Sequence, residues 1–131
     1  MENETKSSET FTVKARAKSF GYAFKGIGYL VKSQHNVWIH LSVTALVIAA
    51  AVLLKADLTG WALLVFAIGI VLVAEMFNTA IEIFVNFVSP GYNEKAGKIK
   101  DLAAAGVLMS ALTAAIIGLI VFVPLIIGQF K

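Results

Sequence analysis

The chain has 131 residues, of which 59% are hydrophobic and 15% are charged, and its formal net charge is +3. A soluble domain is usually about 45–50% apolar and about 25% charged, so this composition excludes a disordered chain and argues against an ordinary soluble globule. The small net charge does not suggest a nucleic-acid-binding protein, and the absence of cysteine excludes disulfide and thiol chemistry. We therefore expect one domain of an integral membrane protein.

The N-terminal region is predicted to form a disordered tail and then a surface helix. Residues 1–10 (MENETKSSET) are polar and favour disorder, whereas residues 11–131 are expected to form a single membrane domain. Residues 12–33 have the pattern of an amphipathic helix with a basic face, which suits the inner surface of a membrane. The apolar side chains, which lie within about 60° of one another on a helical wheel, are Phe20, Phe24, Ile27 and Val31. Arg16 falls on this apolar side, where it is either a snorkelling arginine or a phosphate contact.

Three apolar segments follow, and each is long enough to cross a membrane as a helix. They cover about residues 37–54, 61–88 and 102–127, and a span needs about 17–25 residues for a hydrocarbon core of about 30 Å. Six of the eleven lysine and arginine residues precede the first segment, and three more lie in a linker at residues 92–100. The positive-inside rule therefore places the N-terminus and this linker in the cytoplasm, in a multi-pass protein of the inner membrane.

The second apolar segment carries a stripe of polar residues about 100° wide on a helical wheel. The stripe consists of Glu75, Asn78, Thr79, Glu82 and Asn86. A carboxylate in a membrane helix is costly and usually functional, although a polar seam that only joins helices through hydrogen bonds is the alternative. Glu75 and Glu82 lie about 10 Å apart along the helix axis, too far to ligate one Mg²⁺ together at about 2.1 Å. We therefore expect the deeper Glu75 to meet a membrane lipid and Glu82 to meet a soluble charged ligand or its metal.

The linker adds further charges at the same membrane face. Lys100 and Asp101 stand where the third segment begins, and Asp101 by itself is most simply explained as favouring a helix N-terminus. Beside Glu82, however, the cluster resembles a site for a phosphate compound, in which carboxylates hold Mg²⁺ and lysines neutralise the transferring group. His35 and His40 are isolated in the sequence, and we interpret each as an interfacial or hydrogen-bonding histidine rather than a metal ligand.

Two segments of this chain resemble a known family. AEMFNTAIE at residues 74–82 is followed about 18 residues later by KDLAAAGVL at residues 100–108, and this pair is similar to the small prokaryotic diacylglycerol kinase and undecaprenol kinase family. The resemblance covers about residues 18–125, and NVWIHL at residues 36–41 is more typical of the undecaprenol kinase branch. It implies an all-α membrane protein, with three transmembrane helices and an N-terminal surface helix, that assembles as a homotrimer.

The same resemblance implies an activity and a set of site residues. The activity is transfer of the ATP γ-phosphate to a lipid hydroxyl with Mg²⁺. Glu75 would be the general base, Asn78 would lie beside it, and Glu82 would hold Mg²⁺ together with ATP. Lys100 would contact phosphate, and Asp101 would bind the nucleotide.

Two further assignments depart from the family pattern. Gln34 occupies the position where the family often has a metal-binding glutamate, so it would bind the metal and nucleotide through its carbonyl oxygen and bring no charge. Arg16 is carried over to nucleotide binding from an N-terminal arginine of the family, with which it does not align cleanly.

The leading hypothesis is thus an ATP-dependent lipid kinase that serves phospholipid or cell-envelope lipid-carrier recycling. Undecaprenol is slightly favoured over diacylglycerol as its substrate, on branch resemblance alone. The alternative is a small oligomeric transporter or proton-conducting protein with an intramembrane glutamate pair. A third possibility is a non-catalytic assembly subunit, in which the polar stripe only holds helices together.

Overall fold

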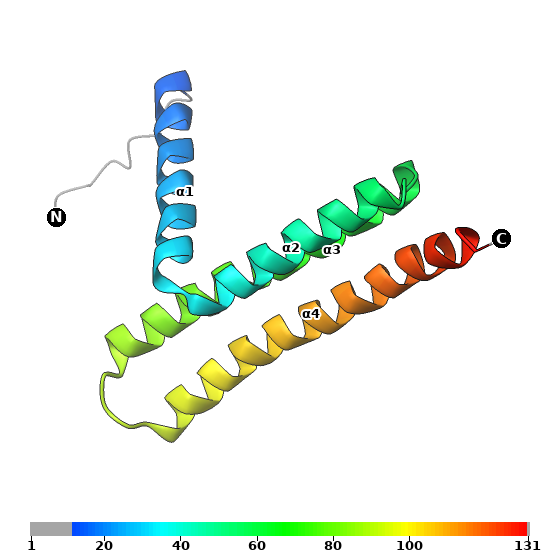
Figure 1. Ribbon diagram of the computed structural model, residues 1–131. Helices are drawn as coiled ribbons and strands as arrows, with labels where there is room; N and C mark the ends of the chain where they lie inside the picture. The colour runs from blue at the N-terminus through cyan, green and yellow to red at the C-terminus, as the bar shows by residue number, and fades with distance from the viewer. Residues whose placement is uncertain (1–11, 131) are drawn as a thin grey trace, which may run out of the picture.

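The computed structural model describes residues 12–130, and this part of the chain is helical with no strand. Four helices follow one another: α1 (Val13–Ser33), α2 (His35–Leu53), α3 (Leu58–Val88) and α4 (Glu94–Gly128) (Figure 1). The predicted all-α class is therefore confirmed. The predicted disordered tail, residues 1–10, lies outside the described residues, and the assignment of residues 11–131 to one domain stays a prediction.

The last three helices are long and apolar enough to cross a membrane. At 1.5 Å per residue, the 19 residues of α2 extend for about 28 Å, close to the hydrocarbon thickness of about 30 Å. The 31 residues of α3 and the 35 residues of α4 give lengths of about 46 and about 52 Å, so these helices must tilt or extend beyond the apolar layer. The protein is thus a membrane protein with three candidate spans.

α3 is the central element of the protomer. It packs against each of the other three helices, and α4 runs antiparallel to it along much of its length (Figure 1). A small core joins α2, α3 and α4 near the α2–α3 connection, and it is formed by Ala51, Leu64 and Val121. Outside this core most apolar side chains of the spans are exposed, which suits contact with lipid or with further copies of the chain.

The α2–α3 connection is short, and it explains why α3 begins at Leu58 rather than at residue 61. Asp57 is the N-cap residue of α3, and its side chain accepts a hydrogen bond of 2.8 Å from the backbone N–H of Gly60. Gly60 itself is buried, and a Cβ atom at this position would lie 3.1 Å from Asp57 Oδ1 and 3.3 Å from Val121 Cγ1. The cap and the close approach together fix the first turn of α3.

The predicted linker at residues 92–100 is helical from Glu94 onward, because α4 begins there and not near residue 102. The side chain of Asn93 caps this helix by accepting hydrogen bonds from the backbone N–H groups of Lys95 (2.9 Å) and Ala96 (3.2 Å). Glu94 and Lys98 then form an ion pair of 2.7 Å across one helical turn. Asp101 therefore lies two turns inside α4, and its interpretation as a residue at a helix N-terminus is wrong.

α1 meets the other helices only at its C-terminal end and crosses them steeply (Figure 1). Leu30 is its one buried residue among those described, whereas Phe20 and Phe24 are about two-thirds exposed. Lys18 and Lys25 both place their Nζ atoms 5.8 Å from the ring centre of Tyr22. A helix with exposed apolar and basic side chains has the composition expected for the membrane surface, and this location stays a prediction.

Candidate functional site

The C-terminal half of α3 holds most of the buried polar side chains in the described part of the chain. Glu75 is 2% exposed, Thr79 is 4% exposed and Asn78 is 9% exposed, while Ser110 on α4 is the fourth member of this group. Glu75 is hydrogen-bonded to His40 on α2, with 3.1 Å between His40 Nε2 and Glu75 Oε1. Glu75, Asn78 and Thr79 of the predicted polar stripe are therefore buried. His40 is the hydrogen-bond partner of the Glu75 carboxylate.

Two atoms of the stripe are buried without any hydrogen-bond partner in the described residues, namely Asn78 Oδ1 and Thr79 Oγ1. A buried polar atom without a partner costs about 1–3 kcal/mol, so native structures rarely leave one unsatisfied. Both atoms lie within one helical turn of Glu75 on α3. Their missing partners are therefore to be sought in a ligand, a water molecule or another copy of the chain.

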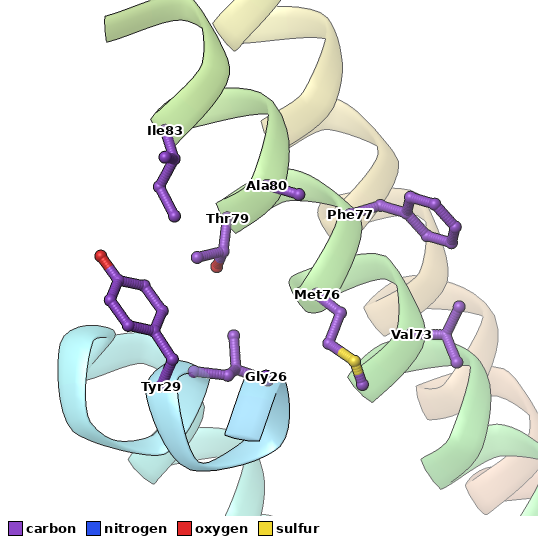
Figure 2. A pocket seen from close by; sticks show the side chains of 9 residues that line it. Gly26, Tyr29, Val73, Met76, Phe77, Thr79, Ala80 and Ile83 are labelled. Atoms are coloured by element: carbon purple, nitrogen blue, oxygen red, sulfur yellow. The ribbon is translucent and has the colours of Figure 1, made fainter. Parts of the chain in front are cut away.

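An apolar cavity of about 470 Å³ lies between α1 and α3, next to this group (Figure 2). Tyr29 of α1 and Thr79 of α3 both line this cavity, and the hydroxyl oxygen of Thr79 is itself buried (Figure 2). The other lining residues are Gly26, Leu30, Val73, Met76, Phe77, Ala80 and Ile83. A cavity of this size with an apolar lining suits part of an apolar ligand.

A second group of polar side chains lies further along α3, toward the α3–α4 connection. Lys100 of α4 donates a hydrogen bond from Nζ to Asn86 Oδ1 over 3.0 Å. Glu82 stands one turn before Asn86 on α3, is half-buried, and has no ion pair or hydrogen bond with another described side chain. Asp101, next to Lys100, is exposed. The structure thus brings Lys100 to the end of the stripe at which Glu82 is available for a ligand.

Two residues predicted for the nucleotide or metal site, Arg16 and Gln34, form no hydrogen bond or ion pair with the Glu82 and Lys100 side chains within one protomer. Arg16 lies in the first turn of α1, at the end that stands away from the other helices (Figure 1). Gln34 is half-buried in the junction between α1 and α2, where its backbone N–H donates to Leu30 O over 3.1 Å. Its side chain caps neither helix.

The donor set for a divalent cation is small. Within residues 12–130, no three acidic, histidine or cysteine side chains gather in a way that could hold a metal ion. Mg²⁺, however, is usually bound through one or two carboxylates together with substrate phosphates, rather than by a complete protein cage. A half-buried and uncommitted Glu82 fits that chemistry.

His40 is the residue of this site that the sequence alone does not identify. It lies 35 residues from Glu75 on a different helix, and no local pattern links the two positions. The sequence indicated only a hydrogen-bonding or interfacial histidine within NVWIHL. The pairing with a carboxylate depends on how α2 packs against α3.

The sequence also matches proteins of known class. The family described as prokaryotic diacylglycerol kinase matches residues 21–122. A diacylglycerol kinase of Synechocystis is 37% identical over 107 residues, which are 81% of this chain and 61% of that protein. An undecaprenol kinase of Bacillus subtilis is 31% identical over 82% of this chain and 87% of its own length. A diacylglycerol kinase of Escherichia coli is 29% identical over 74% of this chain and 85% of its own length.

The helical fold, the intramembrane carboxylate and these similarities define the class of a small membrane-embedded lipid kinase. The chain belongs to the prokaryotic diacylglycerol kinase family, because that family matches more than half of its length. The resemblance predicted from AEMFNTAIE and KDLAAAGVL is confirmed. The matched region spans about three-fifths of the Synechocystis relative and most of the Bacillus relative.

Proposed function

We propose that this protein transfers the γ-phosphate of Mg·ATP to the hydroxyl group of a membrane lipid. The observation that carries the proposal is the buried carboxylate of Glu75 on a membrane-spanning helix, in a chain of this kinase family. A carboxylate at such a depth is costly unless it has a function, and a general base is the function that lipid phosphorylation requires.

Glu75 and Asn78 would serve the lipid. In the proposed reaction Glu75 accepts the proton of the lipid hydroxyl while the hydroxyl oxygen forms its bond to the γ-phosphorus. The bond from that phosphorus to the β–γ bridging oxygen breaks, so ADP leaves and Glu75 holds the proton. Asn78, whose Oδ1 is buried without a partner among the described residues, would lie beside the base in the site.

Glu82, Lys100 and Asp101 would serve the nucleotide. Glu82 would hold Mg²⁺ together with the phosphates of ATP, Lys100 would contact phosphate, and Asp101 would bind the nucleotide. When bound, Mg²⁺ neutralises charge on the phosphate groups.

Gln34 and Arg16 are proposed as further nucleotide contacts, and Gln34 would add a carbonyl ligand for the metal. Arg16 stands away from α3 within one protomer, so we place its contact in a site shared between protomers of a homotrimer. This assembly would also cover apolar side chains that a single protomer leaves exposed.

The cavity between α1 and α3 is proposed as the place where the substrate's apolar chain begins. Its lining is almost entirely apolar, and the Thr79 hydroxyl lies on the stripe next to Asn78. Diacylglycerol and undecaprenol both combine one hydroxyl group with long apolar chains. NVWIHL favours undecaprenol, and the role would be phospholipid or cell-envelope lipid-carrier recycling at the inner membrane, with the N-terminus in the cytoplasm.

The test is transfer of labelled γ-phosphate from ATP to lipid in mixed micelles, with diacylglycerol and undecaprenol offered separately, with and without Mg²⁺. The proposal predicts a labelled lipid phosphate that forms only with Mg²⁺. Ion flux through protein-containing liposomes, without phosphorylation of either lipid, would instead identify a transporter and overturn the proposal.

A further inference from the structure

The hydrogen bond between His40 and Glu75 carries an inference beyond the proposed set of site residues. His40 lies in the second turn of α2 and is 22% exposed, whereas Glu75 in the middle of α3 is 2% exposed. Within the described residues, this is the one hydrogen bond that the Glu75 side chain makes. The other polar side chains of the α3 stripe do not bond to it, so His40 alone holds the carboxylate from the protein side.

The chemistry of the pair favours a definite geometry. An ionised carboxylate has two oxygens with about four acceptor positions, and His40 uses one of them, on Oε1. Either a neutral imidazole with its proton on Nε2 or an imidazolium ion can donate this bond. Oε2 is left to accept the proton of a substrate hydroxyl.

A glutamate side chain without such a partner would sample several rotamers in the apolar interior. A general base must stay within hydrogen-bond reach of the proton that it removes, and a misplacement of about 1 Å can cost about 100-fold in rate. Enzymes that use a base therefore often orient it with a third group.

We propose that His40 is a positioning residue, whose Nε2–H donates to Oε1 of Glu75 and directs Oε2 toward the lipid hydroxyl. The inference rests on the proposed function, because it assigns a role relative to the base. His40 does not itself contact the substrate in this scheme. It should therefore affect the rate of the chemical step and not the binding of ATP or lipid.

The experiment compares three substitutions of this residue in the full-length protein. His40→Gln keeps an N–H donor near the place of Nε2, whereas His40→Asn is too short to reach Glu75, and His40→Leu has no donor. We expect kcat to fall about 10- to 100-fold in the Asn and Leu variants, with KM for Mg·ATP and for lipid unchanged. His40→Gln should recover most of kcat.

The controls separate this role from a purely structural one. His35→Leu changes the other histidine of the chain, which is exposed at the first residue of α2, and it should keep the wild-type kcat. If the bond only joins α2 to α3, thermal stability would fall in the Leu variant while kcat per folded molecule stayed at the wild-type value, and the proposal would be overturned. If His40→Leu does not fold, the contrast between the Gln and Asn variants decides in the same way.

The outcomes also separate the positioning role of His40 from the proposed kinase activity. A wild-type protein that phosphorylates a lipid, together with equal kcat in the Gln, Asn and Leu variants, would reject the positioning role and leave the kinase intact. A wild-type protein that phosphorylates no lipid would reject the proposed function and this inference with it.

Discussion

At the residue scale, the site is defined by which buried polar atoms have partners and which do not. Glu75 is paired with His40 across 3.1 Å, which lowers the cost of a carboxylate in an apolar interior. Asn78 Oδ1 and Thr79 Oγ1 are buried without partners one turn further along α3. The protomer therefore does not satisfy the stripe by itself, and the two atoms require a ligand, a water molecule or another copy of the chain as a partner.

Replacement of Glu82 by glutamine tests the nucleotide end of the stripe. Glu82→Gln removes the negative charge of the side chain that we propose binds Mg²⁺. KM for Mg·ATP should therefore rise at least about tenfold, because the loss of a residue that only hydrogen-bonds to a metal ligand already costs about tenfold in metal affinity. KM for lipid should not change. Steady-state kinetics over a range of Mg·ATP concentrations measures both values.

The matched control is Glu94→Gln, which removes an exposed carboxylate that is paired with Lys98 at the start of α4. It should leave the Mg·ATP dependence as it is in the wild type. A Glu82→Gln enzyme with the same dependence as this control would show that Glu82 does not hold the metal.

The sequence predicted part of this site and missed the rest for a physical reason. Helical periodicity places Glu75, Asn78 and Glu82 on one face without any knowledge of the neighbouring helices. The pairs His40–Glu75 and Lys100–Asn86 join residues on different helices, and they depend on the rotation and depth at which those helices pack. No pattern along the chain contains that information.

At the element scale, the apolar segments predict which parts of the chain form membrane-spanning helices, whereas capping side chains determine where α3 and α4 begin. The second span is predicted over residues 61–88, but α3 begins three residues earlier, at Leu58, because Asp57 caps it there. Asn93 starts α4 well before residue 102, because its side chain satisfies two backbone N–H groups of the first turn. Hydropathy finds the part of a helix that lies in lipid, and these polar caps lie outside that part.

Removal of the Asp57 cap should destabilise the protein without changing its site. Asp57→Ala loses the acceptor for the Gly60 N–H, so the free energy of unfolding should fall by about 1 kcal/mol. Asp57→Asn keeps an oxygen acceptor and should lose far less. Denaturation in detergent micelles, followed by circular dichroism, measures the difference, and an alanine variant as stable as the wild type would contradict this role.

At the scale of the whole molecule, the protomer is an open arrangement with little interior of its own. α2 and α4 each bury only two residues, and α3 buries eight. The polar half of α3 and the first turns of α4 lie toward the end of the molecule where α3 connects to α4, and the C-terminal end of α1 packs against α2 and α3 (Figure 1). Membrane topology therefore decides whether the site meets cytoplasmic ATP.

Cysteine labelling measures that topology directly, because the chain contains no cysteine of its own. Thr59 at the start of α3 and Tyr92 between α3 and α4 are both exposed and suit single replacement by cysteine. The lysines near Tyr92 favour the cytoplasm, so a membrane-impermeant maleimide should label Thr59→Cys in intact cells and Tyr92→Cys only after lysis. Both variants should react in detergent, and the reverse pattern in cells would contradict the proposed orientation.

The role of Glu75 as the base of a lipid kinase is measured by phosphate transfer in the Glu75→Gln variant. Glutamine keeps an oxygen that can accept the hydrogen bond from His40, so the fold and thermal stability should be close to those of the wild type. It cannot accept the hydroxyl proton, and transfer of labelled γ-phosphate to the lipid should fall by about 10²- to 10⁴-fold. A folded Glu75→Gln protein that phosphorylates lipid at close to the wild-type rate would show that Glu75 is not the base.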